Sequence, residues 1–272
     1  MGGLMPGGDV NDTSNSVEVV HPKGAGGVLL LCEHAARHIP ARYDGLGLDA
    51  QARDSHAAWD PGARAVALQL SRALDAPLVA SRVSRLVYDC NRPPEAETAM
   101  PQQSELIEVP GNRDLTPTQR EERTEAVYRP FCAAVSDMIA TRRARGLSTV
   151  VITIHSFTPI YFGAWRETEI GILHDSDSRL ADAMLAEADR LPERRIARND
   201  PYGPEDGVTH SLKLHGIANG LHNVMIELRN DLVVDEAGVA AMAQELMTLI
   251  APALDTLGEP GGGQGTGEGA NA

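Results

Sequence analysis

Short apolar runs that alternate with helical patterns constrain the fold of this chain more than any other feature. Three of these runs are too short for amphipathic helices and are aliphatic or β-branched, so they predict buried strands: Gly27–Cys32, Ala76–Val83 and Thr149–Ile154. Asp60–Asp75 lies between the first two, has apolar residues at helical spacing, and carries Pro61 where a first turn tolerates proline. Such alternation predicts an α/β protein with a mostly parallel sheet sandwiched by helices.

The remaining patterns extend this organisation along the chain. Thr116–Gln119 reads as a capping box that opens a long helix to about Arg145, with Pro130 expected to kink it. Four further segments are predicted as a possible third strand (Leu86–Cys90), two helices (Ser178–Leu191 and Asp235–Leu254) and a weakly helical stretch (His210–Gly220). We expect one domain over residues 19–257, with disordered Gly-rich or polar tails at 1–18 and 258–272.

Composition and charge exclude several classes of partner. Hydrophobic residues make up 42% of the chain but aromatic residues only 4%, so the core must be mainly aliphatic. The net charge of -14 argues against nucleic acid or an anionic membrane surface as the main partner. No apolar run reaches the roughly 18 residues of a membrane span. Three widely spaced cysteines and an N-terminus without the regions of an export signal predict a reduced, cytoplasmic protein, and no pattern indicates an oligomeric state.

The apolar run Val224–Leu232 carries charged residues in its middle. Glu227 and Arg229 stand two positions apart, so a strand would point both side chains to the same face. Burying a carboxylate costs several kcal/mol, of the order seen for unpaired charges, unless a cation, a metal or hydrogen bonds receive it. The run therefore predicts a site that holds a polar ligand.

Further polar residues stand where predicted strands end or a helix begins. Glu33 and His34 follow the first strand, His155 follows Thr149–Ile154, and Asp60 opens the first helix. Because ligands of open α/β sheets bind beyond the carboxyl ends of strands, these groups and Glu227 are expected at one edge. Two histidines with carboxylates are typical ligands of a catalytic zinc ion. The alternative is that each histidine is a hydrogen-bonded structural residue and that Asp60 is a plain helix N-cap.

Other candidates surround this group. Asn91 and Arg92 in the loop Val87–Pro93 could bind a substrate carboxylate, because a guanidinium presents a planar fork; a salt-bridged loop arginine is the alternative. Further positions could belong to the site or could equally be buried, structural or surface residues. They are two cysteines beside the motifs, Cys32 and Cys90, four histidines, His38, His210, His215 and His222, and the segment Phe157–Trp165 as a pocket wall.

Five segments together resemble the N-formylglutamate amidohydrolase family. They are C-E-H-A-A-R-H-I-P, A-W-D-P-G-A, Y-D-C-N-R-P, V-I-T-I-H-S-F and H-G-I-A-N-G-L-H-N-V-M-I-E-L-R-N-D-L, in family order from about Val28 to Leu232. The resemblance implies a three-layer α/β/α fold like that of zinc-dependent exopeptidases, which related cell-wall amidases share. It also implies hydrolysis of N-formyl-L-glutamate, a small molecule, to formate and L-glutamate, as in histidine degradation.

Site roles follow from the same resemblance. It implies His34, Asp60 and His155 as ligands of Zn²⁺ or another divalent metal. Asp54 and His56 are rivals of Asp60, because the amidases use glutamate there.

The resemblance further implies Glu227 as the catalytic carboxylate and a substrate clamp at Asn91 and Arg92. Arg229, on the face of Glu227, is expected to bind a second carboxylate or the developing oxyanion. Residues expected to support the site from behind are Glu33, His38, His56, His210 and His215.

Two alternatives remain at this stage. One is a zinc amidase of another N-acyl amino acid or of a peptide. The other is a non-catalytic binding protein on the same fold, although a protein without turnover has no chemical reason to retain Glu227, His34 and His155 together.

Overall fold

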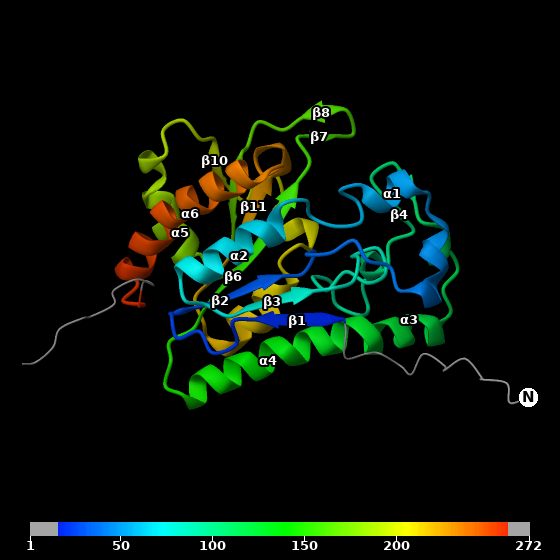
Figure 1. Ribbon diagram of the computed structural model, residues 1–272, viewed down its shortest axis with the longest axis horizontal. Coiled ribbons are helices and arrows are strands. Elements are labelled where there is room, and N and C mark those ends of the chain that lie inside the picture. Colours follow the sequence, from blue (N-terminus) through cyan, green and yellow to red (C-terminus); the bar gives the residue numbers. More distant parts are fainter. Residues whose placement is uncertain (1–15, 261–272) are drawn as a thin grey trace, which may run out of the picture.

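A computed structural model describes residues 16–260 of the protein (Figure 1). Its centre is a seven-stranded sheet in the order β1-β3-β2-β6-β11-β9-β10. The strands are β1 (Val17–Val20), β2 (Val28–Cys32), β3 (Leu78–Ser81), β6 (Val150–Phe157), β9 (Ile170–Leu173), β10 (Ile196–Arg198) and β11 (Asn223–Arg229). β1 pairs antiparallel with β3, and β9 pairs antiparallel with β11, whereas the other four pairings are parallel. The mostly parallel sheet is therefore confirmed.

Helices cover both faces of this sheet. α2 (Ala63–Ala73), α5 (Arg179–Ala186) and α6 (Glu236–Thr256) pack on one face, and α4 (Arg129–Ala144) lies along the other, as Figure 1 shows. The remaining helices are α1 (Ala50–Asp54) and α3 (Pro117–Arg123). Two short hairpins, β4 (Gln103–Ser104) with β5 (Ile107–Glu108) and β7 (Ile160–Tyr161) with β8 (Ala164–Trp165), lie outside the main sheet.

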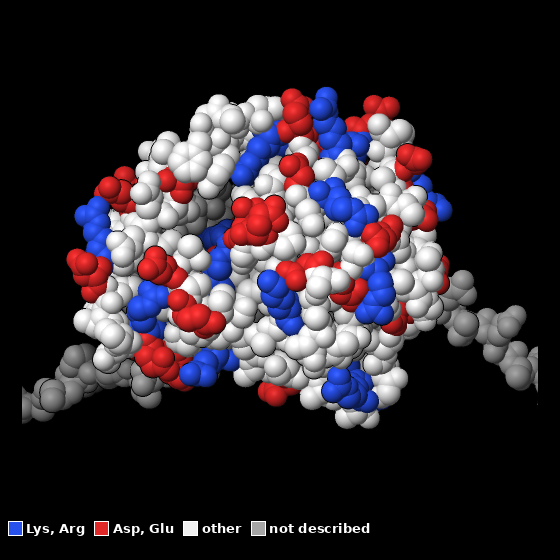
Figure 2. Space-filling model, turned by 180° about the vertical axis from the view of Figure 1, so that it is seen from behind, with Lys and Arg blue, Asp and Glu red and all other residues white. Residues whose placement is uncertain are grey.

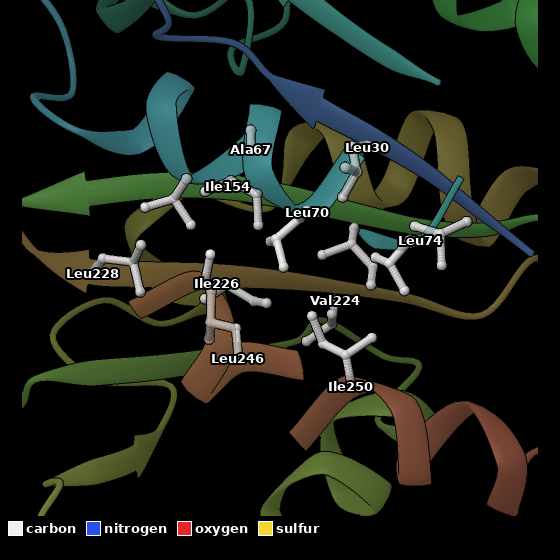
Figure 3. Packing of buried hydrophobic residues seen from close by; sticks show 14 of the residues in the cluster. Leu30, Ala67, Leu70, Leu74, Ile154, Val224, Ile226, Leu228, Leu246 and Ile250 are labelled. Carbon is white, nitrogen blue, oxygen red and sulfur yellow. The ribbon is translucent and has the colours of Figure 1, made fainter. Parts of the chain in front are cut away.

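Alternation along the central strands builds two cores. Leu30, Ile154 and Ile226 face α2 and α6, where they meet Leu70 and Leu246 (Figure 3). Residues one position away face α4, among them Leu29, Leu31 and Val151. Because side chains alternate between faces, His155 and Glu227 point away from α2 and α6.

α6 is long and apolar enough to cross a membrane by length and composition. Its apolar side, however, contributes Leu246, Leu249 and Ile250 to the core against α2 and the sheet. In this structure it is a core helix of the α/β domain.

Most predicted elements are present, with shifts at their ends. The capping box is present, with Thr116 accepting a hydrogen bond from the backbone N–H of Gln119. The long helix that follows contains a π-helical turn, Thr124–Tyr128, just before Pro130, which lacks a backbone N–H. α2 begins at Ala63 rather than Pro61, because Gly62 at φ +81 is its N-cap.

Three expectations need correction. Leu86–Cys90 forms hydrogen-bonded turns rather than a strand, with the backbone N–H of Val87 bonding the carbonyl of Ser84 at 2.9 Å. The strands β1, β9 and β10 were not expected from the sequence. β1 begins at Val17, inside the predicted N-terminal tail; the rest of the predicted tails lies mainly at 1–15 and 261–272, outside the described residues.

Candidate active site

His34, Asp60 and His155 meet at one point although they lie far apart in the sequence. His34 stands two residues after β2, Asp60 precedes α2, and His155 lies within β6 rather than after it. The Nδ1 atoms of His34 and His155 are 3.1 Å apart. Asp60 Oδ2 lies 3.2 Å from His34 Nδ1 and 3.0 Å from His155 Nδ1. A tetrahedral ion with ligand distances of about 2.0–2.1 Å has its ligands about 3.3 Å apart. The triangle therefore has the size that one small divalent ion requires.

Two more carboxylates stand behind the imidazole rings. His34 Nε2 lies 2.7 Å from Asp89 Oδ1, and His155 Nε2 lies 3.1 Å from Glu33 Oε2. A carboxylate behind a ring holds the proton on Nε2 and leaves the Nδ1 lone pair for a metal. Asp89 makes such a hydrogen bond with His34, whereas Glu33 lies at ion-pair distance from His155 without a hydrogen bond. The two Nδ1 atoms face each other at 3.1 Å, an arrangement that a bound cation would stabilise. The donor set thus fits a divalent metal.

The charges of this cluster shift its titration. Burial alone would lower the pKa of His155, but Glu33 and Asp60 raise it well above the ordinary value. Burial likewise opposes ionisation of Asp60, yet His34 and His155 hold the pKa of its carboxyl below the usual range. The cluster without an ion therefore holds anionic carboxylates beside a protonated His155. A bound cation would take the place of that proton among the same carboxylates.

Arg85 joins the carboxylates of the cluster, although its role was not foreseen from the sequence. Its guanidinium lies 3.3 Å from Asp60 Oδ1 and 3.0 Å from Asp89 Oδ2. One side chain thus fixes both the carboxylate in the triangle and the carboxylate behind His34. The spacing Arg85 to Asp89 in a turn-forming loop was the available signal, but the loop was expected to be a strand.

Glu227 lies beside the triangle on the neighbouring strand. In the parallel register of β6 and β11, its Cα is the partner of His155. The side chain is 5% exposed, and Glu227 Oε2 has no hydrogen-bond partner among the described residues. Burial, more than the charge of Asp60, raises the pKa of Glu227 to about 7. A carboxyl group that titrates near neutrality can both accept and return a proton.

A cavity of about 170 Å³ opens onto these groups. This is smaller than the ~300–1,000 Å³ of pockets for drug-sized ligands, so it suits a small metabolite. The cavity lies among the His34–Asp60–His155 triangle, the loop of Asn91 and Arg92, and the segment after β6. Its other principal wall residues are Arg85, Glu105, Tyr161, Tyr202 and Glu227.

Asn91 and Arg92 both line this cavity, but the Asn91 side chain bonds residues of another segment, whereas the Arg92 side chain bonds its own loop. The Asn91 amide donates to the carbonyl of Val208 and accepts from the backbone N–H of Ser211 at 2.9 Å, so it joins two loops. Arg92 donates to the carbonyl of Asn91 at 3.0 Å, and within residues 16–260 no carboxylate lies at ion-pairing distance from it. Of the predicted clamp, Arg92 is the group left to bind an anion.

Arg229 does not line the cavity, contrary to its predicted role. Its guanidinium lies 2.9 Å from Asp231 and 3.5 Å from Glu169, and it stacks 4.9 Å from the ring of exposed Trp165. It also donates to the carbonyls of residues 166 and 167. Two acids neutralise the charge, because the chain after β11 and the start of β9 converge there.

The rival ligands do not join the triangle. Exposed Asp54 pairs with Arg37 at 3.3 Å. His56 lines the cavity but pairs with Glu105 at 2.8 Å. His38 is exposed in a separate, open depression of about 1150 Å³.

The later histidines support neighbouring structure. His210 bonds the Tyr128 hydroxyl at 2.8 Å. His215 is buried, which lowers its pKa to about 4, and His222 lies 3.8 Å from Glu259. Burial also raises the pKa of the Cys32 and Cys90 thiols well above normal, so neither is a thiolate near neutral pH.

Comparisons with known proteins place the chain in a family. Residues 26–234 match the model of the family described as N-formylglutamate amidohydrolase. The gene product Atu2144 from Agrobacterium tumefaciens is 55% identical, with a TM-score of 0.89 over 92% of this chain and 99% of that one. N-formylglutamate amidohydrolase from Ralstonia eutropha JMP134 is 19% identical and shows the same fold, with a TM-score of 0.63 over 89% of this chain and 97% of that one. No curated protein shows significant sequence similarity to the chain. Because the family match spans most of the sequence, the chain belongs to the N-formylglutamate amidohydrolase family of amide-hydrolysing enzymes.

Proposed function

We propose that the protein hydrolyses N-formyl-L-glutamate to formate and L-glutamate and that a divalent metal, Zn²⁺ in the first instance, serves the reaction. The observation that carries the proposal is the buried triangle of His34, Asp60 and His155 beside Glu227 at one small cavity. His34 and His155 would hold the ion through Nδ1 and Asp60 through Oδ2. A cytoplasmic location and a small-molecule substrate, rather than nucleic acid or membrane, belong to the same proposal.

The residues of the chain divide the work of amide hydrolysis. A divalent ion held by His34, Asp60 and His155 would supply Lewis acidity for the attacking water and the amide carbonyl. Glu227, at the level of His155, accepts the proton of the attacking water and passes it to the departing amine nitrogen. Arg92 binds a substrate carboxylate. Asp89 and Glu33 keep the two imidazoles oriented through their Nε2 atoms.

The decisive variant is Glu227→Gln. It keeps the shape of the side chain but removes the base, so kcat should fall by about 10²–10⁴-fold while the metal content is unchanged. Formate release and elemental analysis measure the two quantities. Turnover at the wild-type rate in this variant would refute the assigned role.

Metal dependence is tested separately. Dialysis against a chelator should abolish formate release, and added Zn²⁺ should restore it. His155→Ala should lower both the metal content and the activity. A purified protein that turns over while free of divalent ions would contradict the proposal, and one that holds the ion without any turnover would favour the binding-protein alternative.

A further inference from the structure

We propose that Tyr202 and Arg166 form the subsite for the side-chain carboxylate of the substrate and so select N-acyl amino acids with acidic side chains. This inference rests on the proposed function and assigns its specificity to two residues without an earlier role. Tyr202 would contact the carboxylate directly, and Arg166 would supply the positive charge behind it.

Arg166 lies behind the aromatic wall of the cavity. Its guanidinium carbon is 4.2 Å from the ring centre of Tyr161, 4.8 Å from that of Tyr202 and 5.6 Å from that of Phe157. All three rings line the cavity. Such stacking holds a cation in place and leaves the N–H groups at its edge for an acceptor.

The charge of Arg166 is not neutralised by any residue of the range 16–260. Within the described part of the chain, no carboxylate lies at ion-pairing distance from Arg166. Its side chain donates a hydrogen bond to the Tyr202 hydroxyl at 3.0 Å. Arg85 and Arg229, by contrast, each contact two acids. Arg92 is the other cation at the cavity without an acidic partner. Two unneutralised guanidinium groups correspond to a ligand with two carboxylates.

Tyr202 connects this charge to the cavity. Its oxygen accepts the hydrogen bond from Arg166, so its own O–H hydrogen is available to an acceptor in the cavity. Burial and the nearby Glu227 raise the pKa of Tyr202 to about 12, which keeps the hydroxyl protonated. A carboxylate beside Tyr202 would therefore receive a hydrogen bond from the phenol and a favourable charge interaction from Arg166.

A dianionic ligand needs such local positive charge, because the chain as a whole carries a net charge of -14. Arg229, expected from the sequence to meet the second carboxylate, is neutralised by Asp231 and Glu169. Arg166, in the segment between β8 and β9, takes that role instead.

The test compares two substrates of nearly equal shape, N-formyl-L-glutamate and N-formyl-L-glutamine. Arg166→Met and Tyr202→Phe should each lower kcat/KM for the glutamate compound by about 10- to 100-fold and change the glutamine compound by less than about threefold. Tyr202→Phe keeps the ring stack, so it remains informative if Arg166→Met does not fold. Arg190→Met removes an exposed arginine that pairs with Glu187, and it should leave the ratio unchanged.

A binding measurement needs no turnover. Calorimetry should show that glutarate binds wild-type protein more tightly than glutaramate, its monoamide, and that Arg166→Met removes this difference. Equal losses for both substrates would assign Tyr202 to the reaction itself and overturn the subsite. An unchanged glutamate-to-glutamine ratio in both variants would overturn it as well. A wild-type protein that cleaves no N-formyl amino acid would instead refute the proposed function.

Discussion

Asp89 shows how a residue outside the His34–Asp60–His155 triangle can control the protonation of that triangle. Its carboxylate accepts from His34 Nε2 at 2.7 Å and also receives Arg85. Burial would raise the pKa of Asp89, but His34 and Arg85 hold it well below its ordinary value. The residue is therefore an anion across the neutral range, and it fixes which nitrogen of His34 carries the proton.

Replacing this anion should weaken metal binding. Asp89→Asn is expected to lower the Zn²⁺ affinity by about 10- to 100-fold, because the amide no longer compensates the charge on the imidazole. Competition with a chromophoric chelator measures the affinity. The matched control is Asp54→Asn, at the exposed rival position, which should bind as wild type does. Equal effects of the two substitutions would contradict the geometry described here.

The sequence allowed some of these residues to be predicted and not others. His34, Asp60 and His155 could be found because histidines and acids at strand ends converge at one edge of an α/β sheet. Arg85 and Tyr202 could not, because a loop arginine or tyrosine has no periodicity that shows what it contacts. Arg229 was misplaced for a related reason: the alternation of β11 gave its face correctly, but not the two acids that meet it there.

The elements of the sheet differ in how readily they could be predicted. β2, β3 and β6 are buried along their whole length and are mainly aliphatic or β-branched, which is typical of central parallel strands, so the sequence predicts them. β1 and β10 are edge strands of three or four residues that are only partly buried, so they lack such a run. β9 is buried but only four residues long and contains Gly171, where a Cβ would lie 2.2 Å from the carbonyl oxygen of Asp200. Pairing with a neighbouring strand, rather than a local sequence pattern, forms these three strands.

At the scale of elements, α6 should contribute much of the stability. Leu246 of α6 is fully buried against α2 and the sheet (Figure 3). Leu246→Ala should therefore reduce the free energy of unfolding by about 2–5 kcal/mol, through lost burial and the cavity left behind. Urea denaturation followed by circular dichroism measures this change. Leu106→Ala, at a side chain that is 72% exposed, should change it by less than about 0.5 kcal/mol. A loss as large at Leu106 would contradict the burial described.

At the scale of the whole molecule, charge is distributed rather than concentrated. Acidic and basic side chains are interspersed on the face shown in Figure 2, where no continuous basic surface is seen. The unusual charges are inside, where the carboxylate of Glu227 is buried without a hydrogen bond at Oε2. The rest of the fold must therefore offset the free energy that is lost by burying the Glu227 carboxylate.

That cost should appear in the pH dependence of folding. The pKa of Glu227 is raised to about 7 in the folded protein from 4.5, so the folded state binds a proton more readily than the unfolded state between these values. The stabilisation from protonation is complete below pH 4.5 and is lost as the pH rises through 7. In chelator-treated protein, Glu227→Gln should consequently be more stable than wild type at pH 8, by up to about 3 kcal/mol.

The difference between the two proteins should shrink towards pH 4.5, and urea unfolding at the two pH values measures it. The comparison cancels other groups that titrate in the same range, such as His215, because both proteins contain them. A variant that is less stable than wild type at pH 8 would show that Glu227 is stabilised by contacts other than those described.

The pairing of β6 with β11 has a practical consequence. His155 and Glu227 stand side by side only in the observed alignment, and a shift of one residue would turn one of them to the opposite layer. A misaligned chain would keep its secondary structure and pass a spectroscopic check, yet it would be inert. An enzymatic assay can therefore check refolded protein, because it detects only molecules in which β6 and β11 pair in the observed register.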